Sequence, residues 1–452
     1  MTLSTQPYKG ARDFYPEDKR VQKYIFAHMR EMAERFGYEE YDAPILEPLD
    51  IYLAKSSQEI VDEQTYVFTD RGGRNVVIRP EMTPTVSRMI AAKRQELPYP
   101  MRLYSIPNLW RYERPQKGRL REHWQLNVDI FGVDGVEAEH EIISVADQIL
   151  RSYGARRDMY TIQLNSRMLT EELFGSYLGL DATQKSTLIR LIDRIKKMEP
   201  AEFIAQADAI LTPSQRDSGV LDSLQQLLRA RDLEHLPSGF ESNPSVLRLK
   251  MLMSMLRESR VMNAKFDITL MRGFDYYTDI VFEMVDTNPE NNRSMFGGGR
   301  YDGLVGLFGV EPVPTVGFGM GDVTMQNFIE SHELLPMLHP ETDAYVVLIG
   351  DNIYERAQQP LMELRKMGVN LAVDTTGRKP DKQIKTAVKK GLHYVIFIGE
   401  AELASEQFKV RNLADGTEES HGLQRIVSIV KDRRHVNERA ADLEDNEDIE
   451  DL

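Results

Sequence analysis

The chain has 452 residues, of which 41% are hydrophobic, contains no cysteine and carries a formal net charge of -15. This length and composition predict two or three globular domains. The absence of cysteine excludes disulfides, thiolate zinc sites and a cysteine nucleophile, and the negative charge argues against a protein that coats nucleic acid indiscriminately. No stretch has the pattern of a signal peptide or the length of a membrane span, so we expect a cytoplasmic protein with no membrane contact.

The first part of the chain predicts one long helix followed by an antiparallel sheet. Apolar side chains recur at helical spacing over residues 17–36, and Gly37 ends the pattern. Residues 38–49 have extended character, with Pro44 at a position that only an edge or a break in a sheet tolerates. Four runs with strand character follow, separated by turn sequences, at 65–69, 75–80, 102–113 and 124–133. Their spacing predicts an antiparallel sheet.

The middle of the chain changes character twice. Residues 166–262 show helical periodicity with proline-containing breaks, and we interpret them as a helical insertion. Strand character returns over 266–285, and glycines are then dense in 296–309 and 315–323.

The last third of the chain predicts a separate α/β domain. Residues 331–342, with a proline on each side of their apolar centre, have the character of a linker. Strand-like and helical runs then alternate at 343–350, 352–367, 369–374, 381–390 and 393–399. This order predicts a βαβαβ unit with a mainly parallel sheet. Residues 436–452 hold eight acids and one arginine, which predicts a disordered, solubilising tail.

Two stretches concentrate polar chemistry in the first part of the chain. Residues 111–121 hold five cations and one acid in a loop broken by Pro115 and Gly118. This loop is either a solvated hairpin tip or a device whose guanidiniums grip the phosphates of a nucleic-acid end. In "RPEMTP", Glu81 and Thr83 both offer hydrogen-bond acceptors to an ammonium group, although a helix-capping turn explains the same letters.

A third stretch places Arg272 at the start of the strand-like run 270–285. Because an unpaired buried charge is costly, this arginine reaches solvent, joins an ion pair or holds an anion. In a regular strand Tyr276 and Tyr277 point to opposite faces, so only one of them shares a face with Arg272. The glycines at 297–299 let backbone approach a ligand or a neighbouring strand closely, and they equally suit a tight turn.

Taken in order, these stretches resemble the class II aminoacyl-tRNA synthetases, and more narrowly the histidyl-tRNA synthetase family, over residues 8 to about 432. The helix at 17–36 with the strand through Pro44 is similar to motif 1, which builds the dimer interface in that class. The other matches are motif 2 at 109–132, the start of motif 3 at 315–321, and two histidine-specific signatures at 272–278 and 297–304.

This resemblance implies an α+β catalytic core with an antiparallel class II synthetase sheet, a helical insertion and a C-terminal α/β anticodon-binding domain. The expected segments are the first part of the core at 1–165, the insertion at 166–262, the second part of the core at 263–330, the linker at 331–342, the anticodon-binding domain at 343–435 and the acidic tail at 436–452. A homodimer is expected through motif 1.

The resemblance also implies a reaction: ATP and histidine form histidyl-adenylate, and the histidyl group is transferred to the end of histidine tRNA. Arg111 and Arg272 match the catalytic cations at the α-phosphate, with Mg²⁺ on the other phosphates and no separate metal site. The ATP positions are Arg111, Glu113, Arg119, Arg121 and Arg272. The histidine positions are Glu81, Thr83, Gln125, Asp129, Tyr276, Tyr277 and Tyr301. The tRNA positions are Gln116 and Lys117 in the motif 2 loop, and Arg378, Lys379, Lys382 and Lys385 at the helix over 381–390, where Lys389 shares the face.

Two positions depart from the family pattern. Asp129 stands where glutamate is frequent, which shortens the carboxylate by one methylene. Thr324 stands where motif 3 usually has an arginine that packs on adenine. ATP binding must then rest on other residues, with Arg119 and Arg121 as candidates.

The second departure keeps other functions open. A catalytically silent relative that binds histidine as a signal, such as the regulatory subunit of ATP phosphoribosyltransferase, needs neither Arg272, nor the basic motif 2 loop, nor an anticodon domain. A scaffolding protein that binds tRNA without catalysis needs the anticodon domain but not Glu81, Gln125 and Tyr277.

Overall fold

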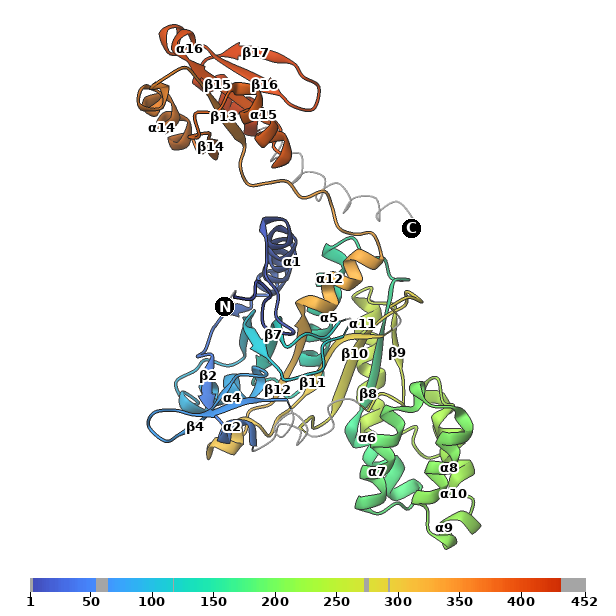
Figure 1. Cartoon of the computed structure of the whole chain (residues 1–452). Coiled ribbons are helices and arrows are strands. Elements are labelled where there is room, and N and C mark those ends of the chain that lie inside the picture. Colours follow the sequence, from blue (N-terminus) through green and yellow to red (C-terminus); the bar gives the residue numbers. More distant parts are fainter. Residues whose placement is uncertain (1–2, 54–63, 117, 272–275, 292, 432–452) are drawn as a thin grey trace. The chain divides into compact units, whose positions relative to one another are not determined.

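The structure is a computed structural model that describes residues 3–53, 64–116, 118–271, 276–291 and 293–431 (Figure 1). By its internal contacts the chain divides into two units: Met1–Phe14 with Gln22–Leu335, and Tyr15–Val21 with the residues from Pro336 onward. Within the ranges just given, every helix is too short or too polar to cross a membrane. The chain starts with α1 (Pro16–Arg35), as its apolar period predicts.

A nine-stranded sheet forms the centre of the first unit. Its order is β1-β5-β7-β12-β11-β10-β8-β9, with β6 paired to β7. The strands are β1 (Glu39–Glu40), β5 (Met101–Ser105), β6 (Asn108–Trp110), β7 (Glu122–Phe131), β8 (Tyr160–Ser166), β9 (Ala264–Phe266), β10 (Ile280–Asp286), β11 (Ser294–Arg300) and β12 (Thr315–Gly321). The inner pairs are antiparallel, as expected, whereas β1–β5 and β8–β9 at the two ends are parallel.

The register of the sheet gives its two faces opposite chemistry, because successive residues of a strand point to opposite sides. One row across five strands is apolar apart from a glycine: Val128, Phe318, Gly298, Phe282 and Leu164. Tyr160 shares the side of Leu164 on β8; it donates to Asp147 of α5 (Glu137–Ser152), and its ring meets Phe328 of α12 (Asp322–Ser331). These helices therefore cover the apolar face and leave the other face for polar groups.

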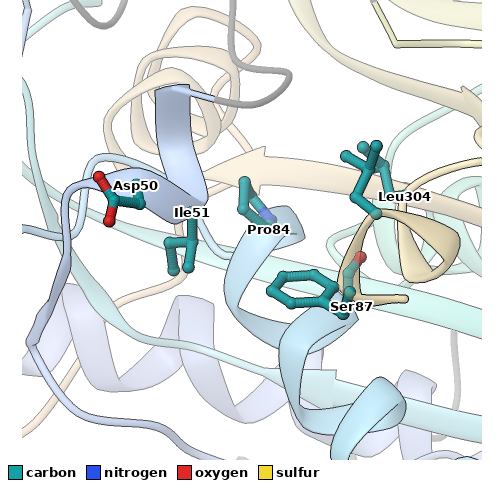
Figure 2. Close-up of a pocket in the computed structure, with 7 residues that line it drawn as sticks. Asp50, Ile51, Pro84, Ser87 and Leu304 are labelled. Atoms are coloured by element: carbon teal, nitrogen blue, oxygen red, sulfur yellow. The ribbon is translucent and has the colours of Figure 1, made fainter. Parts of the chain in front are cut away.

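A small sheet and three short helical elements lie beside this core. The sheet has the order β2 (Leu46–Pro48), β4 (Asn75–Ile78) and β3 (Tyr66–Thr69). An apolar cavity of about 170 Å³ lies against α2 (Asp50–Leu53), α4 (Thr83–Ala92) and the 3₁₀ helix η4 (Val305–Phe308), as Figure 2 shows. Its lining residues are Asp50, Ile51, Pro84, Ser87, Leu304, Leu307 and Phe308.

The insertion is helical, in agreement with its periodicity. It contains α6 (Arg167–Glu172), η1 (Leu173–Tyr177), α7 (Ala182–Asp193), η2 (Ile195–Lys197), α8 (Pro200–Ile210), α9 (Pro213–Asp217), α10 (Val220–Leu228), η3 (Leu233–His235) and α11 (Pro244–Glu258). Capping boxes at Asp181 with Gln184 and at Thr212 with Gln215 start two of these helices.

The strand expected over 266–285 is wrong over the described residues 267–271 and 276–279. The strand β9 ends at Phe266 and β10 begins only at Ile280. The Asp267 carboxylate accepts a hydrogen bond from the Thr269 backbone at 2.9 Å, and this turn competes with sheet pairing. Arg272 lies outside the described residues.

The second unit has a five-stranded sheet in the order β14 (Leu371–Val373), β13 (Ala344–Ile349), β15 (Tyr394–Gly399), β16 (Phe408–Asn412) and β17 (Glu418–His421). Its helices are α13 (Ile353–Arg356), α14 (Gln358–Lys366), α15 (Pro380–Lys389) and α16 (Glu400–Ser405). The three expected strands are present and parallel. The prediction of a mainly parallel sheet is wrong, because β16 and β17 add two antiparallel pairings.

Candidate active site

The polar face of the nine-stranded sheet has a floor of glycines. Opposite Asp129 on β7, the register places Gly317 of β12 and then Gly299 of β11, and the next row places Gly319 and Gly297 opposite Asn127. A Cβ atom at Gly317 would lie 2.0 Å from Asp129 Oδ1, and one at Gly319 would lie 2.1 Å from Gln125 Nε2. The glycines are therefore required because polar side chains of β7 lie across them. We define this surface as the glycine floor.

Asp129 and Tyr301 form a buried polar pair beside the glycine floor. The Tyr301 hydroxyl donates to the Asp129 carboxylate, and Asp129 is 4% exposed. Burial raises the pKa of Asp129 to about 7, against the lowering effect of the Tyr301 hydrogen bond. The pair thus carries a carboxyl group whose charge changes near neutral pH.

Tyr276 and Tyr277 both lie at this site. Their ring centroids are 4.5 Å apart, and Tyr276 meets the Tyr301 ring edge-on at 6.1 Å. A Cβ atom built on Gly299 would lie 3.1 Å from the Tyr277 ring. The alternation expected of a regular strand does not apply, because these residues precede β10 (Ile280–Asp286) and adopt no strand conformation.

Glu81 and Thr83 lie at the start of α4. Glu81 is buried, and its backbone carbonyl accepts a hydrogen bond from the Tyr52 hydroxyl at 3.1 Å. The N-cap of α4 is Met82, whose side chain makes no capping hydrogen bond. The stretch "RPEMTP" therefore forms the N-terminal turn of a helix, as the capping explanation expects, but without a side-chain cap from its N-cap residue.

The motif 2 residue Arg111 is tied to the same segment. Its Nε donates at 2.9 Å to the carbonyl of Pro80, the residue that precedes Glu81 in the chain. His123 shares the polar face of β7, and burial lowers its pKa to about 3, with smaller contributions from Arg111 and Arg12. This neutral histidine next to two cations escaped the sequence reasoning.

The loop after β6 closes with a turn in which Gln116 and Arg119 exchange backbone hydrogen bonds of 3.0 and 2.9 Å. Arg119 is 64% exposed, with its Nη1 atom 3.5 Å from the Glu113 carboxylate. Arg121 is held instead: its guanidinium lies 4.0 Å from the Tyr112 ring centroid and donates to the Tyr8 hydroxyl at 3.1 Å. Of the two expected replacements for the motif 3 arginine, Arg119 therefore has fewer contacts within the protein and is more accessible to a ligand. Lys117 lies outside the described residues.

Thr324, at the position of the usual motif 3 arginine, makes a hydrogen bond within the protein. Its hydroxyl donates to the Gly321 carbonyl at 2.9 Å in the first turn of α12. The neighbouring Asp322 pairs with Arg12 at 2.7 Å and accepts from the Trp124 backbone at 3.0 Å. This end of α12 is held by contacts within the protein.

Asn127 and Tyr41 also belong to the site, although the sequence reasoning missed them. Asn127 Oδ1 accepts from Gln125 Nε2 at 2.8 Å, and its position two residues along β7 is the signal that could have revealed it. Tyr41 has its pKa raised well above the usual value, first by burial and then by the charge of Asp129. Nothing in the sequence around Tyr41 indicates this neighbour.

The second unit carries the expected cations on and before α15. Lys379, Lys382, Lys385 and Lys389 are exposed. Arg378 is partly engaged, because it pairs with Asp374 at 2.9 Å. The pKa of Asp374 is about 2; burial acts to raise it, and hydrogen bonds from Thr376, Tyr345 and Arg378 outweigh that effect.

Comparison with known proteins identifies the family of the chain. The histidyl-tRNA synthetase family model matches residues 10–322, and the anticodon-binding domain model matches residues 343–433. The histidine–tRNA ligase of Leptospira biflexa is 40% identical over 433 residues, which cover 95% of this chain and 98% of that protein.

Two solved structures share the fold. The histidyl-tRNA synthetase from a Nostoc species has a TM-score of 0.80 at 21% identity and covers 96% of this chain and 100% of its own. A Bacillus halodurans protein described as an ATP phosphoribosyltransferase regulatory subunit/histidyl-tRNA synthetase has a TM-score of 0.73 at 22% identity, over 88% of this chain and 99% of its own. The fold class expected from the sequence is confirmed. From the two family models and the near full-length identity to a histidine–tRNA ligase, we conclude that the chain belongs to the histidyl-tRNA synthetase family.

Proposed function

We propose that this chain activates histidine with ATP to histidyl-adenylate and then transfers the histidyl group to the 3′ end of histidine tRNA. The single observation that carries the proposal is the Asp129–Tyr301 pair beside the glycine floor. It supplies a buried polar group for a ligand, held above strand positions that carry no side chain.

The imidazole of histidine suits this site because its neutral ring has one donor and one acceptor. The Asp129 carboxylate accepts from one ring nitrogen, and the hydroxyl of Tyr276 or Tyr277 donates to the other. A site built in this way rejects amino acids without these groups by roughly ten-thousandfold, because its own polar atoms would be left unpaired. Glu81, Thr83 and Gln125 take the α-ammonium group in this proposal.

Arginine side chains bind the phosphates of ATP in this proposal. Arg111, which contacts the Pro80 carbonyl, and Arg272, by the family match, stabilise the charge that builds on the α-phosphate when the histidine carboxylate attacks. Glu113, Arg119 and Arg121 complete the ATP side.

Magnesium accompanies ATP in this proposal and is held mainly by phosphates and water. No cluster of three or more His, Asp or Glu side chains suited to a metal occurs among the described residues. Mg²⁺ on a nucleotide needs only one or two protein carboxylates, and Glu113 is the carboxylate available in the motif 2 loop.

Transfer RNA contacts two regions in this proposal. The motif 2 turn with Gln116 and Lys117 reaches the acceptor end, and the cations around α15 contact backbone phosphates near the anticodon. The match of residues 343–433 to an anticodon-binding domain favours the ligase over a histidine-sensing regulatory subunit.

We further propose that the chain is cytoplasmic and forms a homodimer. Exposed apolar side chains support the dimer, since Leu46 and Phe68 share one face of the small sheet and are 48% and 45% exposed. Leu307, 46% exposed, lies at the apolar cavity of Figure 2. Surfaces of this kind commonly become interfaces.

The deciding experiment is exchange of labelled pyrophosphate into ATP, run separately with each of the twenty amino acids. We expect exchange with histidine alone. Absence of exchange with histidine, from protein with a cooperative unfolding transition, would overturn the ligase; histidine binding without exchange would favour the regulatory subunit.

A further inference from the structure

Residues 165–167, where β8 leads into the helical insertion, contact the chain before and after residues 272–275. Those four residues of the first histidine signature lie outside the described residues. Asn165, the penultimate residue of β8, donates to the Leu270 carbonyl at 3.0 Å on one side. On the other side Arg167 Nη1 donates to the Tyr277 carbonyl at 2.7 Å, and its backbone N–H donates to the Asp279 carbonyl at 3.0 Å. Ser166 also donates to the Asp279 carboxylate at 2.7 Å, so three consecutive residues contact the segments on both sides of the signature.

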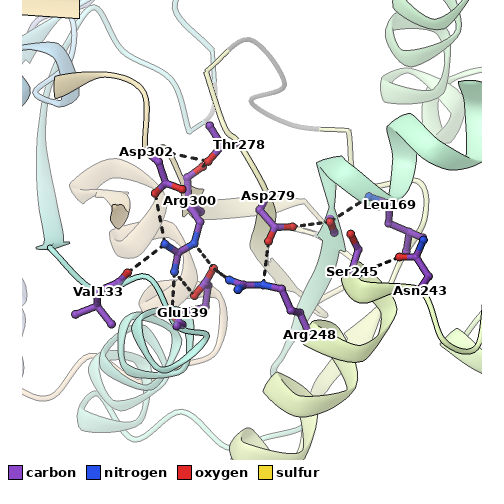
Figure 3. Close-up of polar contacts among 12 residues, drawn as sticks. Val133, Glu139, Leu169, Asn243, Ser245, Arg248, Thr278, Asp279, Arg300 and Asp302 are labelled. Carbon is purple, nitrogen blue, oxygen red and sulfur yellow. Dashed lines mark hydrogen bonds and ion pairs between the residues drawn. The ribbon is translucent and has the colours of Figure 1, made fainter. Parts of the chain in front are cut away.

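The last helix of the insertion, α11, contacts the same segment at Asp279, as Figure 3 shows. Arg248 of α11 lies with Nε 3.1 Å from the Asp279 carboxylate and with Nη2 3.6 Å from the Glu139 carboxylate. Glu139 is fully buried and takes a two-pronged pair from Arg300, with both distances 2.7 Å. An uncompensated charge in this chain of ion pairs would be costly, so its members hold one another in place.

This network is connected through the backbone to the three tyrosines of the site. Tyr301, the partner of Asp129, directly follows Arg300 in the chain. The Thr278 backbone N–H donates to the Arg300 carbonyl at 2.7 Å, which joins the segment of Tyr276 and Tyr277 to the segment of Tyr301. Residues of the insertion therefore touch the backbone of the site without lying in it.

We propose that Arg167 and Arg248 are positioning residues through which the helical insertion sets the backbone that carries Tyr276, Tyr277 and Tyr301, and hence the affinity for histidine. The inference rests on the proposed histidine site. Arg216 on α9 has the same chemistry but contacts the insertion itself: it donates to the Asp208 carbonyl at 2.7 Å and pairs with the Asp208 carboxylate at 3.2 Å.

The test is calorimetric titration of the full chain with histidine, because this binding does not depend on catalysis. Arg167→Met should raise the Kd for histidine by about tenfold, the ratio that corresponds to one lost charge-assisted hydrogen bond. The KM for ATP in pyrophosphate exchange should stay within about twofold. Arg167→Lys, which keeps one donor for the Tyr277 carbonyl, should restore most of the affinity, and Arg248→Met should raise the Kd in the same direction. Arg216→Met, the matched control, should leave it unchanged.

An unchanged Kd for histidine in folded Arg167→Met and Arg248→Met would overturn the inference. Equal losses in the lysine and methionine variants, or equal losses of histidine and ATP binding, would also overturn it, since both indicate general disruption. Should the wild-type chain bind histidine without catalysing exchange, the proposed ligase would fall, while the comparison of Kd values would still decide the role of the two arginines.

Discussion

The glycine floor and the exposed face of α15 both offer polar groups to a ligand, yet they are built in opposite ways. On the glycine floor the carboxylate of Asp129 is buried and hydrogen-bonded to Tyr301, and its neighbours are held by pairs such as Arg300 with Glu139. On α15 the ammonium groups of Lys382, Lys385 and Lys389 are exposed to solvent.

The difference separates selectivity from attraction. A buried group at a fixed place discriminates strongly, because any ligand that fails to match it leaves it unpaired. Exposed cations attract any polyanion and lose affinity as salt is added. We therefore expect substitutions at the glycine floor to reduce activity with histidine, and substitutions at α15 to weaken the binding of tRNA alone.

The largest expected effect is at Gly317. In Gly317→Ala the new Cβ would meet Asp129 Oδ1 at 2.0 Å and the Val128 carbonyl at 2.8 Å, so the carboxylate must move. We expect histidine-dependent exchange to fall by about a thousandfold or more. Gly175→Ala in the insertion is the control, since a Cβ there meets nothing nearer than 3.6 Å. Equal activity of the two variants would show that the floor does not need its glycine.

Arg272→Ala should lower the rate of adenylate formation by about a hundredfold to a thousandfold, as expected for loss of a preorganised cation at a developing charge. Histidine binding should remain, because this arginine is assigned to the phosphate. Single-turnover kinetics with calorimetry separate the two quantities. A normal rate would remove Arg272 from the mechanism.

The next effect concerns stability and pH. The pKa of Asp129 is about 7 in the folded chain against 3.8 for an ordinary aspartate, because the carboxyl is buried. Between these values only the unfolded chain gives up the proton, so this group destabilises the fold progressively as pH rises from 3.8 towards 7.

Asp129→Asn removes this titration. The free energy of unfolding of the variant relative to wild type should therefore increase from pH 5 to pH 8, by on the order of 2 kcal/mol. Urea unfolding can be followed by tryptophan fluorescence, since the two tryptophans of the chain, Trp110 and Trp124, both lie in the first unit. A pH-independent difference would contradict the raised pKa.

The smallest expected effect is at α15. Replacing Lys382, Lys385 and Lys389 together by alanine should raise the KM for tRNA by about tenfold and reduce the salt slope of binding by about two to three. Exchange of pyrophosphate should not change. Lys409→Ala is the control, because that ammonium already pairs with Glu418 at 3.7 Å in the same unit. An unchanged salt slope in the triple variant would move tRNA contact elsewhere.

Much of the fold follows from local patterns. The apolar period of α1 and the alternation of strands and helices from Ala344 to Gly399 are strong signals, and the structure has both. The hairpin of β16 and β17 was missed because its short strands carry many charged residues. The strand expected over 266–285 was too long, because turn formation at Asp267 and the pull of Asn165 on two carbonyls outweigh β propensity.

For the site, the sequence by itself determined the kinds of groups: a carboxylate on β7, tyrosines before β10, glycines on two strands and a basic loop after β6. Only the tertiary structure decided which of them meet. The register of β7, β12 and β11 puts Asp129 over Gly317, the loss of strand geometry brings Tyr276 and Tyr277 to one place, and stacking holds Arg121 at the base of its loop. The reason is that residue types record local chemistry, whereas register and side-chain partners depend on contacts between segments far apart in the chain.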